Sequence, residues 1–288
     1  IANGKIIRPG SVAVIARNFM AGMTGIISPS RQTYDTLTKY KVKAPIEIIP
    51  TGVNVLHGAN EDTSAKLRGE LGLAPDTPVV LSLGRVAFEK NLDDALSVFA
   101  EALETVPEAK FVIVGGGPAM EALQEHVSAL EITDHVIFTG EVNHNDVYGY
   151  YKMGDVFVSA SVSETQGLTF IEAMTADTPV VAIHSPYLDT IVTDKNIGQL
   201  VDDSFQLLEP MVSYLQAKEM GTVIGNPDAR QQVLHEIDER TFGKRVIDFY
   251  AEALAVYHEE EDTEAAEAND VEYSKTFLLR NPFRRDNS

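Results

Sequence analysis

The sequence contains no cysteine, so no disulfide bond can contribute to its stability. This absence fits a reducing compartment and fits secretion without disulfides equally well. No apolar run approaches the ~18 to 20 residues that a helix needs to span a bilayer, which argues against an integral membrane protein. The first residues have neither an initiator methionine nor the pattern of a signal peptide, so we expect the 288 residues to come from a longer chain.

Motifs for several common chemistries are also missing. No Asp-x-Asp pair occurs, and no histidine or cysteine cluster has the spacing of metal ligands. There is no Gly-x-Ser-x-Gly elbow and no P-loop, and the seven histidines are scattered along the chain. We therefore expect no metal and no cofactor, and a bound diphosphate would take most of its counter-charge from lysine and arginine.

A general excess of positive charge is absent, because the net charge is −20. This argues against nucleic-acid binding, which requires a basic surface. The charge is uneven, however: residues 1–52 carry seven lysines and arginines against two acids, and residues 259–272 form an acidic run. We expect residues 259–288 to be a disordered tail. Its tip, residues 273–285, mixes aromatic residues with arginines and either contacts an anionic membrane surface or is simply disordered.

A hydrophobic content of 44% and a mean hydropathy of −0.07 predict a soluble globular protein. Apolar, β-branched runs alternate with helical patterns, such as the one beginning near Asn91. Because the runs lack polar alternation, they predict an α/β fold with a parallel sheet covered by helices on both faces, as in doubly wound folds. The ligand crevice of such a sheet lies beyond the carboxyl ends of its strands. The five runs are residues 79–83, 111–114, 136–138, 156–158 and 180–183.

Two glutamates eight positions apart, Glu164 and Glu172, follow the fourth apolar run. A helix is predicted from Gly167, which places Glu172 roughly 7 to 8 Å along its axis at ~1.5 Å per residue. Two carboxylates so placed could hold two parts of one elongated polar ligand. The alternative is an acid in an N-terminal turn and a half-exposed helical glutamate. An anion site is expected at the first N–H groups of this helix, those of Gly167, Leu168 and Thr169.

The first run ends in a loop that begins at Gly84 and carries Arg85 and Lys90, beside the start of the next helix. Arginine offers a planar fork to two oxygens and lysine a mobile point charge, so the pair predicts a diphosphate clamp. The alternative is that these cations pair at the surface with Glu89 or Asp93.

Glycines follow the second and third runs. Gly115, Gly116 and Gly117 would permit close backbone approach to a flat ring or a phosphate, although a tight strand-to-helix turn is the alternative. They are not a dinucleotide fingerprint, because Met120 stands where Gly-x-Gly-x-x-Gly needs its last glycine. The third run ends in a loop that includes Val142.

These motifs together resemble the donor half of the retaining family 4 glycosyltransferases, which have the GT-B type of fold with two Rossmann-like domains. The resemblance covers roughly residues 1–255 and is closest to the bacterial diacylglycerol glucosyltransferases, which make the glucolipid anchors of membranes and lipoteichoic acids. The motifs are Arg85 with Lys90, the turn at Gly115 to Gly117, and Glu164-x7-Glu172 followed by Thr178-Pro179-Val180-Val181-Ala182. The closer resemblance extends to residues 17–20, 28–30, 50–53, 85–91 and 163–169.

The resemblance implies roles for the clamp and for the two glutamates. Arg85 and Lys90 would hold the diphosphate of the donor and stabilise charge on the leaving group. Glu172 would accept hydrogen bonds from the ribose hydroxyls. Glu164 would lie near the donor sugar as a stabiliser or as a nucleophile, and we favour the stabiliser.

The resemblance also assigns parts of the donor to the backbone. The N–H groups of residues 167–169 would face sugar hydroxyls and phosphate. Gly116 and Val142 would flank the base, which is expected to be uracil, and Gly84 and Gly115 would belong to the same donor site.

By the same resemblance, the chain divides into four parts. Residues 1–52 would be the last part of an acceptor-binding N-terminal domain, and residues 53–241 the Rossmann-like domain that binds the donor. Residues 242–258 would form a terminal crossing helix and residues 259–288 the tail. Since most of the N-terminal domain would be missing, we expect this chain alone to bind donor better than it transfers sugar.

The expected function is that of a retaining, metal-independent hexosyltransferase that moves glucose from UDP-glucose to diacylglycerol or glucosyl-diacylglycerol. Such an enzyme would be cytoplasmic and peripheral, on the inner face of the cell membrane, because its lipid acceptor lies at an anionic surface. Two alternatives stay open. One is a family 4 transferase that uses another UDP- or GDP-sugar and a soluble or polysaccharide acceptor, and the other is a non-catalytic partner that binds nucleotide-sugar.

Overall fold

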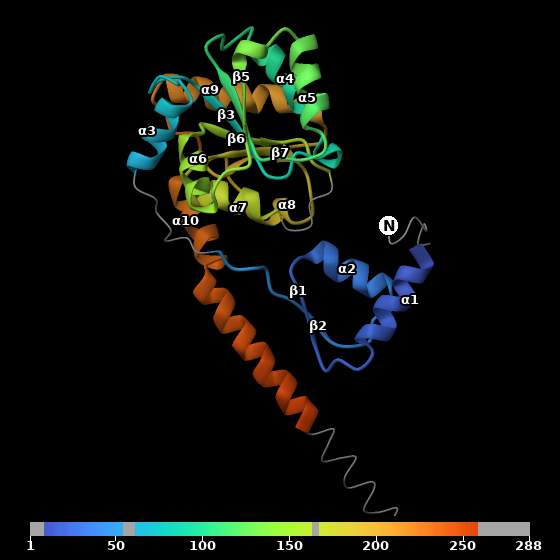
Figure 1. Cartoon of the computed structure of the whole chain (residues 1–288). Helices are drawn as coiled ribbons and strands as arrows, with labels where there is room; N and C mark the ends of the chain where they lie inside the picture. Colours follow the sequence, from blue (N-terminus) through green and yellow to red (C-terminus); the bar gives the residue numbers. More distant parts are fainter. Residues whose placement is uncertain (1–8, 54–60, 163–166, 259–288) are drawn as a thin grey trace, which may run out of the picture. The chain divides into compact units, whose positions relative to one another are not determined.

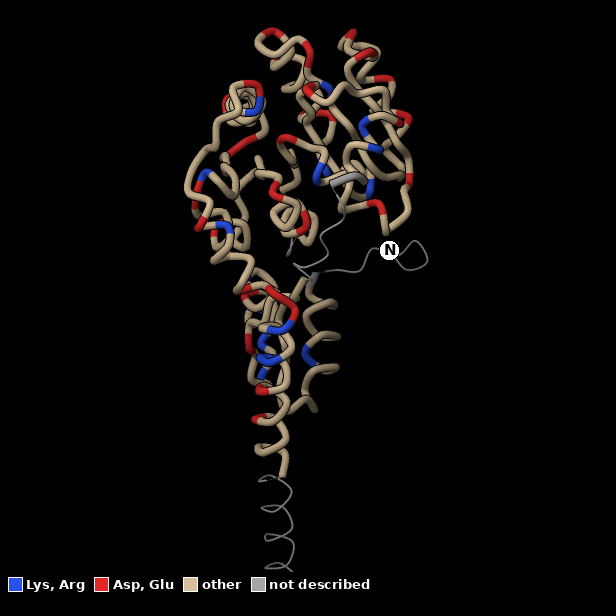
Figure 2. The backbone as a smooth tube through the Cα atoms, turned by 90° about the vertical axis from the view of Figure 1, so that its left-hand side faces the viewer, with Lys and Arg blue, Asp and Glu red and all other residues tan. Residues whose placement is uncertain are grey.

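A computed structural model describes residues 9–53, 61–162 and 167–258. By its internal contacts the chain divides into two compact units. The smaller comprises residues 1–28, 34–49 and 243–288, and the larger comprises residues 29–33 and 50–242. In the larger unit, Figure 2 shows acidic residues spread widely over the backbone and interspersed with lysines and arginines.

The larger unit contains a six-stranded parallel sheet in the order β5-β4-β3-β6-β7-β8. This confirms the predicted α/β fold. The five predicted runs are all strands, and β8 is an additional one that no apolar run indicated. The strands are β3 (Val79–Leu83), β4 (Lys110–Val114), β5 (Val136–Gly140), β6 (Val156–Ser159), β7 (Val180–Ile183) and β8 (Gly198–Val201).

Helices cover both faces of this sheet (Figure 1). One face is covered by α4 (Leu92–Ala102), α5 (Met120–Ala129) and α9 (Leu208–Glu219). The other face is covered by α3 (Glu61–Glu70), α6 (Val147–Met153), α7 (Leu168–Thr175), α8 (Leu188–Ile191) and α10 (Pro227–Glu236). Short 3-10 turns lie at η1 (Phe88–Lys90), η2 (Thr133–His135), η3 (His144–Asp146) and η4 (Ser204–Leu207).

Burial on both faces explains why the strand sequences do not alternate. Val80 and Ile113 lie in the core beneath α4 and α9, whereas their chain neighbours Leu81 and Val112 lie in the core beneath α6 and α7. Residues of both alternating sets along the central strands are therefore mainly apolar. Polar side chains that could bind a ligand are therefore expected at the ends of these strands.

The smaller unit contains α1 (Pro9–Met20), β1 (Ile26–Ser28), most of α2 (Arg31–Lys39) and β2 (Ile46–Ile48). The two strands are parallel neighbours. Residues 239–258 are helical, and within this unit the Arg245 guanidinium donates to the Ile48 carbonyl oxygen at 2.7 Å. The four-part division of the chain stays a prediction, and its acidic tail lies outside the described residues. In the described ranges, no helix combines the length and apolar character needed to cross a membrane.

Candidate functional site

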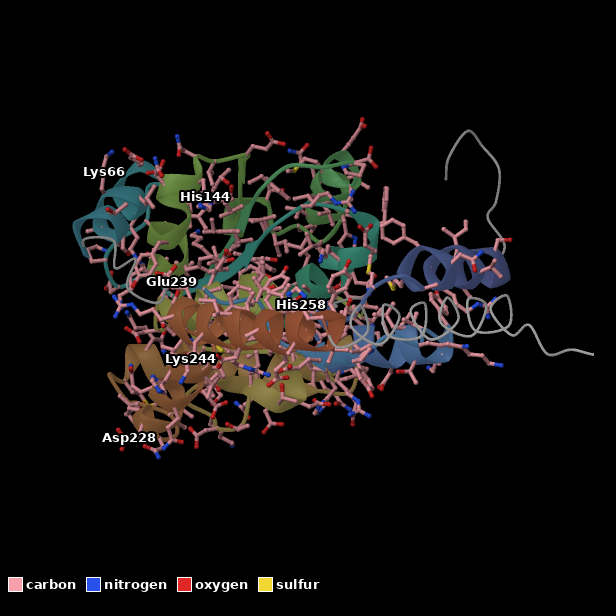
Figure 3. All side chains as sticks on the ribbon, turned by 90° about the horizontal axis from the view of Figure 1, so that it is seen from below. Lys66, His144, Asp228, Glu239, Lys244 and His258 are labelled. Atoms are coloured by element: carbon pink, nitrogen blue, oxygen red, sulfur yellow. The ribbon has the colours of Figure 1, made fainter. Side chains whose placement is uncertain are left out.

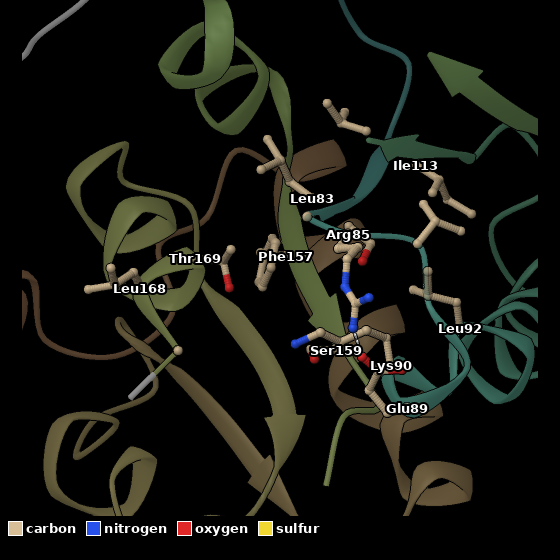
Figure 4. A pocket seen from close by; sticks show the side chains of 15 residues that line it. Leu83, Arg85, Glu89, Lys90, Leu92, Ile113, Phe157, Ser159, Leu168 and Thr169 are labelled. Atoms are coloured by element: carbon tan, nitrogen blue, oxygen red, sulfur yellow. Dashed lines mark hydrogen bonds and ion pairs between the residues drawn. The ribbon is translucent and has the colours of Figure 1, made fainter. Parts of the chain in front are cut away.

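The carboxyl ends of β3, β4 and β6 border a cavity of about 470 Å³ (Figure 4). Open parallel sheets place their ligands at this edge. Arg85, Glu89 and Lys90 lie on one side of the cavity, with Leu168 and Thr169 on the other. The full lining is Ser82, Leu83, Gly84, Arg85, Val86, Glu89, Lys90, Leu92, Ile113, Val114, Phe157, Ser159, Gly167, Leu168 and Thr169.

The loop after β3 brings Arg85 and Lys90 to this cavity, as the spacing predicted. The chain turns through the short η1 and reverses at Asn91, whose φ of 47° is left-handed. The Asn91 side chain donates to the carbonyl oxygen of Ala160 at 3.2 Å, which anchors the loop against the end of β6. The Asn91 amide is thus one of the contacts that hold the two-cation loop in place.

Arg85 forms an ion pair with Glu89, so the surface pairing considered as an alternative is present in the ligand-free chain. Both side chains are about half exposed or more, 64% for Arg85 and 47% for Glu89. An exposed pair of this kind stabilises a fold by only ~0.2 to 1 kcal/mol. A phosphate can therefore replace the Glu89 carboxylate as the partner of Arg85 at low cost.

The beginning of α7 supplies the opposite wall. Gly167 caps the helix with a left-handed φ of 61°, and the Phe170 N–H donates to the Gly167 carbonyl oxygen at 3.0 Å. The first N–H groups of a helix have no carbonyl partner within that helix, and they carry the positive end of its dipole. Leu168 and Thr169 therefore offer an anion-binding backbone to the cavity. Glu164 lies outside the described residues, so its role stays a prediction.

Glu172 lies deeper in α7 and does not line this cavity. Its Oε2 accepts a hydrogen bond from the Tyr151 hydroxyl at 2.9 Å, and Tyr151 itself is fully buried. Burial raises the pKa of Glu172, opposed by the Tyr151 hydrogen bond and by the charge of His144, whose place beside α6 is marked in Figure 3. The sequence pattern around Glu172 did not predict its contact with Tyr151, because the two residues are 21 positions apart.

The glycine turn after β4 packs against the loop of the cations. The Val86 N–H donates to the Gly116 carbonyl oxygen at 2.9 Å. A Cβ on Gly115 would lie 2.0 Å from the Gly84 carbonyl oxygen, and one on Gly117 would lie 2.2 Å from that of Val86. The close approach that needs these glycines is thus to the protein's own backbone.

The predicted base-binding residues lie outside the lining of the cavity. Gly116 is close to the side chain of Glu141, since a Cβ there would meet its Cγ at 3.0 Å. Val142 packs against the core beneath α6 and α7. The roles assigned to Gly115, Gly116, Val142 and Glu172 stay predictions.

Among the described residues, no group of three or more histidine, aspartate or glutamate side chains could hold a metal ion. The arrangement of Arg85, Lys90 and the start of α7 can instead neutralise a diphosphate. Independence from metal stays a prediction.

The family model described as "Glycosyl transferases group 1" matches residues 63–220. The chain is 38% identical over 258 residues to an alpha-monoglucosyldiacylglycerol synthase of Streptococcus pneumoniae (strain ATCC BAA-255 / R6), covering 88% of this chain and 58% of that protein. It is 28% identical to the alpha-monoglucosyldiacylglycerol synthase of Acholeplasma laidlawii, covering 70% of this chain and 52% of that protein. The chain thus spans little more than half the length of these relatives.

Solved structures share the fold. Anabaena Alr3699/HepE in complex with UDP has a TM-score of 0.75 at 18% identity, covering 85% of this chain and 68% of that one. Sucrose-phosphate synthase from Thermosynechococcus elongatus has a TM-score of 0.74 at 23% identity, covering 89% of this chain and 65% of that one. At these identities the likeness shows the GT-B type of fold.

Proposed function

Because the chain belongs to the family of glycosyl transferases group 1, we propose that it is the donor-binding part of a retaining enzyme that transfers glucose from UDP-glucose to diacylglycerol or glucosyl-diacylglycerol. The observation that carries the proposal is the cavity shared by Arg85, Lys90 and the start of α7. The two relatives named alpha-monoglucosyldiacylglycerol synthase support the lipid acceptor.

The proposed chemistry is electrostatic. Arg85 holds two oxygens of the diphosphate, Lys90 adds a point charge, and the N–H groups at the start of α7 face phosphate and sugar oxygens. As the bond to the sugar breaks, negative charge grows on the departing diphosphate, and these fixed groups stabilise it. They need no metal to do so. Glu164 stabilises positive charge on the sugar. The departing phosphate helps to take the proton from the acceptor hydroxyl as the oxygen of that hydroxyl forms the new bond to the sugar.

Recognition of the nucleoside is assigned to Glu172. Its carboxylate accepts from the ribose hydroxyls, with Tyr151 holding Oε2 in place. A hydrogen bond to a charged group contributes ~1.5 to 3 kcal/mol, so Glu172 affects donor affinity strongly. Gly116 and Val142 flank the base in this proposal.

The acceptor requires a membrane surface. We propose a peripheral enzyme on the inner face of the cell membrane, with residues 1–52 belonging to its acceptor domain. In the smaller unit, α1 exposes Ile15 and Phe19, at 61% and 72%, and its last turn carries Arg17. A helix with exposed apolar residues and a cation suits an anionic interface.

Calorimetry with UDP, GDP and ADP tests the donor assignment. We expect this chain to bind UDP more tightly than GDP or ADP, with equal affinity before and after addition of EDTA, because protein cations provide the counter-charge. Undetectable UDP binding, or binding abolished by EDTA, would contradict the donor site.

For the acceptor, the longer enzyme should glucosylate diacylglycerol in vesicles. Activity on soluble sugars alone would overturn the lipid assignment.

Donor binding should depend on pH through Glu172. As the pH falls towards the raised pKa of this residue, protonation makes the carboxyl group a weaker acceptor for ribose hydroxyls. We expect the UDP affinity of the unmodified chain to fall from about pH 7 to about pH 5 more steeply than that of Glu172→Gln. Calorimetry on both proteins isolates the Glu172 contribution, because the UDP phosphates titrate equally in the two titrations. Parallel profiles would contradict the assignment.

The Glu172→Gln variant also has an expected effect on the stability of the fold. A raised pKa means that the folded chain binds the Glu172 proton more tightly than the unfolded chain. The group therefore stabilises the fold below its ordinary pKa, and this contribution is lost as the pH rises through the raised value. At about pH 7, Glu172→Gln should melt no earlier than the unmodified chain, while binding UDP about 10-fold or more weakly.

A further inference from the structure

We propose that a second cavity, at the opposite end of the sheet from the donor cavity, binds a small phosphate-bearing anion. This cavity has a volume of about 310 Å³. Its floor is formed where Asp155 precedes β6 and where Thr178 and Pro179 precede β7, at the amino ends of the strands. The two cavities share no lining residue.

One carboxylate of this cavity serves two cations. The Asp155 side chain is only 6% exposed, and its Oδ2 lies 3.4 Å from Nη2 of Arg68 while its Oδ1 lies 3.2 Å from Nζ of Lys218. The same Oδ2 also accepts from the Val79 N–H at 2.8 Å. Arg68 is committed to structure, because it donates to three carbonyl oxygens, those of Ala74, Thr77 and Met153. Of the two cations, Lys218 lines the cavity and Arg68 does not.

The second carboxylate is shared in the same way. Asp177, held at a left-handed φ of 61°, lies 2.9 Å from Nζ of Lys152 and 3.5 Å from Nη1 of Arg230. Both cations line the cavity. A lysine ammonium has three N–H donors, so after its bond to Asp177 Lys152 keeps donors for a further acceptor.

Counting these groups leaves an excess of positive charge. Among the described residues, three cations line the cavity, Lys152, Lys218 and Arg230, against two carboxylates, Asp155 and Asp177. Arg68 and Asp194 do not line it and add one charge of each sign. A local excess of one positive charge, in a chain of net charge −20, favours an anion.

Arg230 makes the excess costly in the absence of a ligand. The residue is only 6% exposed, and its buried Nε has no hydrogen-bond partner among the described residues. Burial also lowers the pKa of the guanidinium, against the opposing charge of Asp177. A buried cation with one shared carboxylate is incompletely compensated, and an anion in the cavity would supply the missing charge.

The anion would connect three helices. Lys152 lies in the last turn of α6, Lys218 in the last turn of α9, and Arg230 belongs to α10. A phosphate held by all three stabilises the folded chain, because it binds the native arrangement and not the unfolded one. The ligand is either free phosphate or the phosphate group of a small metabolite.

The test is an NMR titration of amide shifts with inorganic phosphate on the full 288-residue chain, at constant ionic strength in chloride. We expect saturating shifts at residues 154–155, 177–178, 196 and 218, with an apparent Kd of about 1 mM or tighter. Shifts confined to residues 84–90 and 167–169 would overturn the proposal, because they would place the phosphate in the donor cavity. The absence of saturating shifts would also overturn it.

Variants make the result specific. Lys152→Gln combined with Lys218→Gln should weaken phosphate binding at least ~5-fold, since two charge-assisted contacts are lost. Lys66→Gln, on the exposed face of α3 (Figure 3), is the control and should leave binding unchanged. If the double variant does not fold, Lys218→Gln alone is measured, and unchanged affinity there would overturn the proposal. A parallel titration with glycerol phosphate separates the two sources, because tighter binding indicates a metabolite.

Discussion

Arg85→Ala is expected to weaken UDP binding roughly 10- to 100-fold, which corresponds to the ~1.5 to 3 kcal/mol of a charge-assisted contact. Arg85 lines the cavity, where its guanidinium forms an ion pair with Glu89 in the ligand-free chain. Alanine removes the fork that contacts two oxygens, and Lys90 cannot replace its planar geometry. Calorimetry with UDP measures the loss directly.

The loss should be confined to the phosphates and should not come from unfolding. Arg85 is 64% exposed, so its replacement should leave the melting temperature nearly unchanged. Uridine, which has no phosphates, should bind both proteins equally. Lys66→Ala, at an exposed, ion-paired lysine outside the cavity, is the control for a general change of charge. UDP affinity that survives Arg85→Ala unchanged would show that the diphosphate lies elsewhere.

Glu89→Gln gives a change in the opposite direction. Glu89 is the acid that lines the described part of the donor cavity, and it competes with phosphate for Arg85. Removing its charge should tighten UDP binding several-fold, because Coulomb repulsion between the carboxylate and the diphosphate is lost. Weaker binding would instead mean that Glu89 serves to position Arg85.

The strands were predictable because one physical requirement acts along each of them. Helices cover both faces of the sheet, so the five predicted strands are built mainly of apolar residues. The strand β8 was not predicted, because it begins at Gly198 and contains Gln199 and so lacks a continuous apolar run. A Cβ on Gly198 would lie 2.1 Å from the Val180 carbonyl oxygen, so glycine is required there by the neighbouring strand. A requirement of tertiary origin leaves no periodic signal in a single sequence.

The candidate site also contains some features that the sequence predicted and some that it did not. Arg85, Lys90 and the start of α7 follow strand ends, so the topology of a parallel sheet was enough to bring them to one cavity. The contact between Tyr151 and Glu172 and the pairing of Arg68 with Asp155 cross 21 and 87 residues. Such contacts depend on how α6 and α3 pack, and the apolar pattern fixes which face of a helix is buried without fixing its partners.

Gly115→Ala is expected to destabilise the larger unit and to abolish UDP binding with it. The methyl group would lie 2.0 Å from the Gly84 carbonyl oxygen, and the φ of 129° at Gly115 is strained for any residue with a Cβ. Backbone strain costs ~1 to 3 kcal/mol and overpacking about as much again. Because domains are stable by only ~5 to 15 kcal/mol, the melting temperature should fall by roughly 10 °C or more.

The clash made by Gly115→Ala should also disturb the donor cavity, because Gly84, which it would displace, directly precedes Arg85. Relief of the clash requires the Gly84 peptide to move, which displaces the Arg85 side chain and disturbs the Val86 hydrogen bond to Gly116. Gly69→Ala is the matched control, since a Cβ there meets no atom within 4 Å and alanine favours helix by ~0.5 to 1 kcal/mol. Thermal melting and UDP calorimetry on both variants test this prediction. Gly115→Ala should lose stability and UDP binding together, whereas Gly69→Ala should lose neither. Equal melting temperatures for the two variants would contradict the packing described for this turn.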